Sequence, residues 1–90
     1  MLKLEYTNKF KKDVKLLQKR GYKMEEMKEI INKLVNEEIP LPAKNCDHKL
    51  SGNLSKYREC HIAPDWLLLY YYLEGVVVFA STGTHSDLFR

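Results

Sequence analysis

Residues 56–81, KYRECHIAPDWLLLYYYLEGVVVFAS, decide the fold because they contain three consecutive strand-like runs. The runs 56–63, 66–73 and 76–81 are rich in aromatic and β-branched residues, and the last two are almost entirely apolar. A Pro-Asp pair separates the first two runs and a Glu-Gly pair the last two, as in hairpin connections. The stretch therefore predicts an antiparallel meander whose central strands are buried.

The chain before this stretch predicts one strand and two helices. Residues 2–6 alternate apolar and polar, which predicts a short strand with one buried face. Helical spacing of apolar residues then predicts a helix capped by Thr7 or Asn8 and ended by Gly21. A second apolar stripe over 27–35 predicts a second helix that folds back on the first. The element order is β-α-α-β-β-β, an α+β fold with a helix hairpin packed on a small antiparallel sheet.

Length and composition limit the class of protein. We expect residues 1–90 to form a single domain with a small core. The two cysteines, Cys46 and Cys60, indicate no disulfide framework. The longest apolar run is far shorter than the roughly 20 residues that cross a bilayer, and the first residues do not resemble a signal peptide. We therefore expect a cytoplasmic protein that does not contact membranes.

The charge distribution is uneven. The net charge is +3, but residues 1–23 contain eight lysines and arginines against two acidic residues. A basic helix suits an anionic partner such as RNA, although an ordinary solvated helix face explains the same charges. The candidate RNA-contacting residues in this helix are Lys11, Lys12, Lys15, Lys19 and Arg20.

The three histidines are the candidate chemical groups. His48, His61 and His85 lie in predicted loops or at strand edges, where side chains from different segments can converge. Histidine titrates at about pH 6.5, so a pair of them can act as acid and base near neutral pH. Single histidines are more often structural, and the residues alone leave both interpretations open.

Metal binding and cofactor binding are disfavoured. Cys46, His48, Cys60 and His61 together have the composition of a zinc site, but they lack the spacings of zinc ligands. Cys60 and His61 are neighbours on a strand, so they point to opposite faces, and we expect Cys60 to be buried. The glycines are isolated, which excludes a phosphate-binding loop and a dinucleotide cofactor.

Several motifs in order resemble the YafQ branch of the RelE-type toxins. They are DHKL at 47–50 followed by Gly52-Asn53, YRECHI at 57–62, PDWLL at 64–68 and TGTHSDLF at 82–89, together with the N-terminal FKKD and KRGY segments. The resemblance extends over nearly the whole chain. It implies a RelE-like fold and a ribosome-dependent mRNA endoribonuclease. It also implies a ribbon-helix-helix antitoxin of the DinJ or RelB kind as partner, with operator DNA contacted only through the antitoxin complex.

The resemblance also implies the residues of the site. The chemistry would be transesterification by the ribose 2′-hydroxyl, without metal or cofactor, with His48 as general base and His85 as general acid. His61 and Asp65 would orient the site or contact RNA. Aromatic side chains that stack on a base contribute about 1–3 kcal/mol each. The positions implied are His48, His61, Asp65 and His85 for catalysis, and Trp66 and Phe89 for base stacking.

One position departs from the family pattern. The motif carries an arginine four residues before its last histidine, and this chain has Ser81 there, which donates a hydrogen bond but carries no charge. Losing one preorganised donor typically lowers a rate by about 10²–10³. Either Arg58, Lys49 or Lys56 supplies the charge, or the chain is an attenuated homologue that binds its antitoxin and co-regulates the operator. A non-catalytic RNA-binding protein that uses the basic helix is a third hypothesis.

Overall fold

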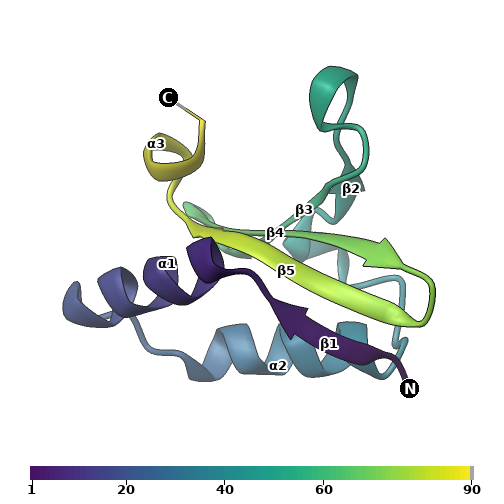
Figure 1. The fold of residues 1–90 in the computed structure, drawn as a ribbon. Helices are drawn as coiled ribbons and strands as arrows, with labels where there is room; N and C mark the ends of the chain where they lie inside the picture. The colour runs from purple at the N-terminus through teal and green to yellow at the C-terminus, as the bar shows by residue number, and fades with distance from the viewer. Residues whose placement is uncertain (90) are drawn as a thin grey trace.

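The computed structural model describes residues 1–89 and consists of one sheet with its two long helices on one face. The five strands lie in the order β1-β5-β4-β3-β2. Figure 1 shows α1 and α2 below the sheet, whereas α3 and the segment that contains β2 rise on the other side. The elements are β1 (Lys3–Tyr6), α1 (Asn8–Lys19), α2 (Glu25–Val35), β2 (His48–Lys49), β3 (Arg58–Ala63), β4 (Trp66–Leu73), β5 (Val76–Gly83) and α3 (His85–Leu88).

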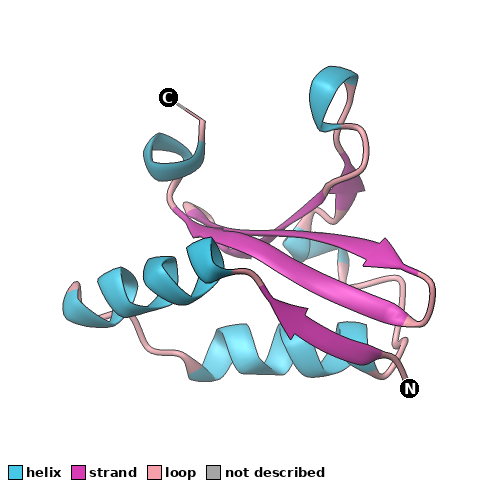
Figure 2. Ribbon diagram, viewed as in Figure 1, coloured by secondary structure: helices cyan, strands magenta, loops and turns pink. Residues whose placement is uncertain are grey.

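The predicted α+β class and the order of the main elements are confirmed, with two details corrected. β1 pairs parallel with β5, so the sheet is mixed and only its other three pairings are antiparallel. The prediction that β1 has a buried face is wrong, because Leu4 and Tyr6 are 40% and 42% exposed. β1 is an edge strand with one neighbour, and the ring of Tyr6 is covered only in part, by Phe10 at 5.2 Å and Phe79 at 5.9 Å between ring centroids. Figure 2 also shows short elements that the pattern did not predict, α3 among them.

The helix boundaries follow from their capping residues. The Thr7 hydroxyl accepts a hydrogen bond from the backbone N–H of Phe10, which makes Thr7 the N-cap of α1. Gly21 has a φ of +88°, a conformation that favours glycine, just after the end of α1. Both positions agree with the sequence pattern.

The core lies between the sheet and the pair α1 and α2. Its residues from the helices include Phe10, Leu17, Ile30, Ile31 and Leu34, and those from the strands include Cys60, Ile62, Leu68, Tyr70, Val77 and Phe79. Within residues 1–89, every helix is too short and too polar to cross a membrane.

Alternation along the strands places a different set of residues on the other face of the sheet. We call this the outer face; it contains Glu59 and His61 of β3, Leu67 and Leu69 of β4, and Ser81 of β5. Leu69 of the central strand β4 pairs with Glu59 on one side and, before a register shift between β4 and β5, with Ser81 on the other. These three residues therefore form one row across the sheet. The segments that rise on this side enclose the outer face from two directions (Figure 1).

Candidate active site

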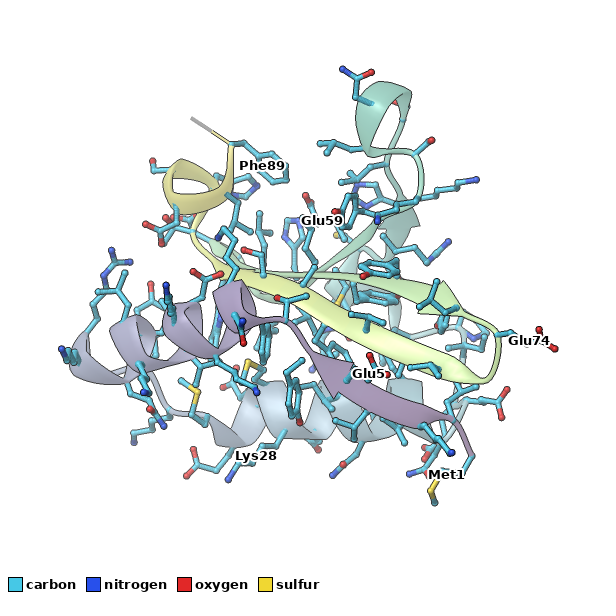
Figure 3. All side chains as sticks on the ribbon, viewed as in Figure 1. Met1, Glu5, Lys28, Glu59, Glu74 and Phe89 are labelled. Atoms are coloured by element: carbon cyan, nitrogen blue, oxygen red, sulfur yellow. The ribbon has the colours of Figure 1, made fainter. Side chains whose placement is uncertain are left out.

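The outer face brings the three histidines into one group around a carboxylate. The Glu59 Oε1 atom lies 3.5 Å from Nε2 of His61 and 3.9 Å from Nε2 of His48. The ring of His85 lies 5.7 Å from that of His61, edge to face. Figure 3 shows Glu59 above the sheet, between the C-terminal arm and the β2 segment. The three histidines come from β2, β3 and α3, so only the folded chain assembles them.

Asp65 fixes the orientation of His85. One carboxylate oxygen, Oδ1, lies 2.6 Å from Nδ1 of His85 and accepts the backbone N–H of the same residue at 3.0 Å. These two hydrogen bonds, the backbone one first, hold the pKa of the Asp65 carboxyl below its usual value. Because an ionised carboxylate only accepts hydrogen bonds, Nδ1 carries a proton. Nε2 is then the atom of His85 that is left for chemistry.

His48 and His61 are each held by one hydrogen bond that involves the backbone. The Nδ1 atom of His48 lies 2.7 Å from the carbonyl oxygen of Cys46, which only accepts, so Nε2 faces Glu59. The backbone of His61 is supported from below, where the buried Asn45 side chain donates to its carbonyl oxygen at 2.7 Å. Asn45 ends the short 3₁₀ helix η1 (Ala43–Asn45). A backbone carbonyl thus orients the ring of His48, and the Asn45 side chain fixes the backbone of His61.

Glu59 is the site residue that the sequence analysis missed. Its side chain is 9% exposed and faces His48 and His61. The signal was available, because residues two apart on a strand share a face and Glu59 precedes His61 by two.

Two predicted site residues lie away from the histidine group. Arg58 and Lys49 pair with each other across β2 and β3 and lie on the face opposite the histidines. The Arg58 guanidinium contacts the Asp47 carboxylate at 3.3 Å and the Tyr70 hydroxyl at 3.4 Å. Both basic residues line a pocket of about 640 Å³ that contains none of the histidines. Neither residue supplies the positive charge that Ser81 lacks.

Trp66 does not present a face for base stacking. It is 5% exposed, its Nε1 donates to Thr82 Oγ1 at 2.9 Å, and its ring packs edge to face on Tyr22 at 5.0 Å. The indole is therefore part of the core. Phe89 differs: it is 40% exposed and follows α3 at the tip of the C-terminal arm, near Glu59 in Figure 3.

The remaining candidates are divided between exposed and engaged positions. The four candidate RNA-contacting lysines of α1 are exposed; they are Lys11, Lys12, Lys15 and Lys19. Arg20 bonds the Asp87 carboxylate at 2.8 Å, so it ties α1 to α3. Ser81 is 4% exposed and donates its hydroxyl to Asp13 at 2.7 Å.

The cysteines lie as the strand pattern predicted, but a different set of possible metal ligands converges. Cys60 is fully buried among the core residues, and burial raises the pKa of its thiol to about 12. Cys60 therefore points away from His48 and His61, and the zinc-like set considered from the sequence does not come together. Glu59, His61 and His85 do, since one ligand atom from each lies within 4.8 Å of the others. The site has enough nitrogen and oxygen donors for a transition metal.

Comparison with known proteins gives the family. The family model described as "Bacterial toxin of type II toxin-antitoxin system, YafQ" matches residues 2–90. This chain belongs to the YafQ family. It is 43% identical over 86 residues to the mRNA interferase toxin YafQ of Escherichia coli K12, which covers 96% of this chain and 94% of that relative.

Solved structures agree with this YafQ-family fold. The toxin chain in the crystal structure of the E. coli DinJ-YafQ complex superposes with a TM-score of 0.93 at 41% identity, over 100% of both chains. A copper-bound mutant toxin from Helicobacter pylori superposes with a TM-score of 0.94 at 36% identity, over 99% of this chain and 100% of that one. The family resemblance and the expected fold are therefore confirmed.

Proposed function

We propose that this chain is a ribosome-dependent mRNA endoribonuclease toxin that acts in the cytoplasm and is neutralised by an antitoxin. One observation carries the proposal: the continuous series of contacts from Asp65 through His85, His61 and Glu59 to His48. This arrangement offers two imidazole Nε2 atoms, those of His48 and His85, each oriented through its Nδ1 and placed at the two ends of the histidine series. Such a pair can move the two protons of RNA transesterification.

The reaction requires one bond to form and one to break. The base removes the proton of the ribose 2′-hydroxyl, and this oxygen attacks the adjacent phosphorus. The bond from phosphorus to the 5′-oxygen then breaks, the acid protonates that oxygen, and a 2′,3′-cyclic phosphate remains. We assign the base to His48, which is oriented by Cys46 and paired with Glu59. We assign the acid to His85, which is oriented by Asp65.

The assignment of acid and base is tested with a modified substrate. An mRNA in which sulfur replaces the 5′-oxygen at the cleavage site has a leaving group that departs without protonation. We expect His85→Ala to regain most of its lost rate on this substrate and His48→Ala to remain slow. Recovery by His48→Ala alone reverses the two roles. Glu59→Gln, which keeps the size of the side chain, should reduce the rate on both substrates because it acts through His48 and His61.

We propose that the reaction needs no metal, because the substrate supplies the nucleophile and the imidazoles move the protons. A metal held by Glu59, His61 and His85 would occupy nitrogen atoms that proton transfer requires. Cleavage should therefore continue in EDTA and decline when copper or zinc ions are added. Loss of cleavage in EDTA with recovery on adding one metal ion contradicts the proposal.

The proposed partners are the ribosome with its mRNA and a ribbon-helix-helix antitoxin of the DinJ or RelB kind. The exposed lysines of α1, together with the more restrained Arg20, would face ribosomal RNA. Charge reversal at Lys12 and Lys19 should weaken ribosome binding without lowering the melting temperature. Operator DNA should be shifted in a gel by the complex with antitoxin and not by the toxin alone.

The alternative function is that of an attenuated homologue that binds antitoxin and co-regulates the operator. The observation that favours it is the burial of Ser81 against Asp13 in place of a free cation. Induction of the wild-type chain in cells separates the two functions. We expect induction to arrest growth, and we expect His48→Ala and His85→Ala to abolish this arrest. Harmless expression that leaves the mRNA on ribosomes intact supports the attenuated homologue.

A further inference from the structure

A small pocket on the outer face is lined by one basic side chain, that of Lys9. Its volume is about 180 Å³, and Tyr57, Leu69 and Ser81 are among the residues that line it. Leu88 of α3 and Lys9 of α1 also line it. Leu69 and Ser81 belong to the same row across the sheet as Glu59. Two strand spacings make the distance from Glu59 to Ser81 about 10 Å between backbones.

Lys9 reaches this pocket because α1 lies alongside the second half of β5. β1 pairs with β5 only as far as Phe79, and beyond it the side chains of α1 contact the strand. The Asp13 carboxylate accepts the backbone N–H of Thr82 at 3.2 Å and the Ser81 hydroxyl at 2.7 Å. The Lys9 ammonium lies 3.0 Å from the same carboxylate oxygen and 2.9 Å from Ser81 Oγ.

The Lys9 ammonium is held in place and remains accessible. The ammonium is hydrogen-bonded to both oxygens of the Asp13 carboxylate and to Ser81 Oγ, and the side chain is 62% exposed. Lys9 lies in the first turn of α1, where a lysine does not stabilise the helix itself. A cation in the first turn opposes the helix dipole, and α1 has no acidic residue in that turn.

The other candidate cations near the outer face contact residues other than Ser81. Arg58 and Lys49 lie on the opposite face, and Arg20 is bonded to Asp87. The Lys56 ammonium lies over the ring of Tyr71, 4.4 Å from its centroid. Lys9 is thus the cation that the described residues place beside Ser81.

We propose that Lys9 binds a backbone phosphate of the RNA next to the bond that is cleaved. This inference rests on the proposed function, because the RNA must lie along the row from Glu59 to Ser81 for its next phosphate to reach the pocket. Lys9 positions the substrate, and the histidines move the protons. The positive charge that Ser81 does not carry is supplied from α1.

The test measures binding without cleavage. A short RNA with 2′-O-methyl ribose, which cannot be cleaved, is titrated into the isolated protein at low salt, and the backbone amides are followed by NMR. We expect the amides of Ser81 and Thr82 to shift in the wild type. Lys9→Gln should weaken binding about tenfold and reduce the salt dependence by about 0.7 in log–log slope. Lys9→Arg should bind nearly as well as the wild type, and Lys3→Gln is the matched control for a lost charge.

Cleavage on ribosomes programmed with mRNA gives the second readout. Lys9→Gln should raise KM more than it lowers kcat, and Ser81→Arg in the Lys9→Gln background should restore part of the affinity. Absence of shifts at Ser81 and Thr82, or equal affinity of Lys9→Gln and Lys3→Gln, overturns this inference. A wild type that binds the RNA through Lys9 but cleaves no mRNA overturns the proposed function and leaves the phosphate contact intact.

Discussion

Trp66→Leu should destabilise the protein strongly and leave cleavage nearly unchanged in the molecules that remain folded. The substitution removes the hydrogen bond from the indole N–H to Thr82 Oγ1, worth about 1 kcal/mol. It also removes the edge-to-face contact with Tyr22, worth about 0.5–1.5 kcal/mol, and leaves a partial cavity that costs about 1 kcal/mol or more. Together these losses amount to about 3 kcal/mol. A domain of this size has about 5–13 kcal/mol in total, so the variant still folds in the cold.

Two measurements check this reasoning. A loss of about 3 kcal/mol should lower the melting temperature by roughly 12–24 °C, which circular dichroism detects directly. Cleavage on programmed ribosomes at 15 °C, a temperature chosen because the variant is folded there, should remain within about threefold of the wild type. An unchanged melting temperature together with lost cleavage would show that the indole contacts RNA and would refute the assignment of Trp66 to the core.

Three other variants or treatments separate the roles of neighbouring residues. Phe89→Ala should weaken RNA binding about tenfold, as lost base stacking does, with little change in melting temperature; a large drop in stability with normal binding argues against stacking. Asp87 hydrogen-bonds Arg20 first and caps α3 second, and both lower the pKa of its carboxyl below the usual 3.8. Asp87→Asn should therefore cost about 1 kcal/mol at pH 7, and the difference from wild type should shrink as pH falls below 3.8 towards the lowered pKa; a difference that stays constant to pH 2 contradicts this. Iodoacetamide at pH 8 should modify Cys46 and leave the buried Cys60 unmodified until urea is added, as mass spectrometry can verify.

The fold was predictable to the extent that its determinants are local. The meander follows from three apolar runs with short turns, and the helices follow from their apolar spacing and from Thr7 and Gly21. The parallel pairing of β1 with β5 was not predictable, because it joins segments from opposite ends of the chain. Its consequence, the exposed Leu4 and Tyr6, follows from an edge position that no local pattern reveals.

The site was predictable only in part, for a related reason. The histidines were identified from motifs, and the structure groups them around Glu59, which strand alternation could have indicated. Alternation also places Arg58 on the wrong face for the role first considered. The contact between Lys9 and Ser81 joins residues 72 apart in sequence, so it depends on how α1 lies beside β5. Such contacts require the folded chain.

The parallel pairing of β1 with β5 also affects when the protein can fold during its own synthesis. β5 lies between β1 and β4 in the sheet, yet it follows every other strand in the chain. A nascent chain that has left the ribosomal tunnel only as far as β4 lacks the strand that holds β1 in place. His85 follows β5 and is still later. The ribosome that makes this chain therefore completes the sheet before it completes the histidine group, and a product that ends within β5 has neither.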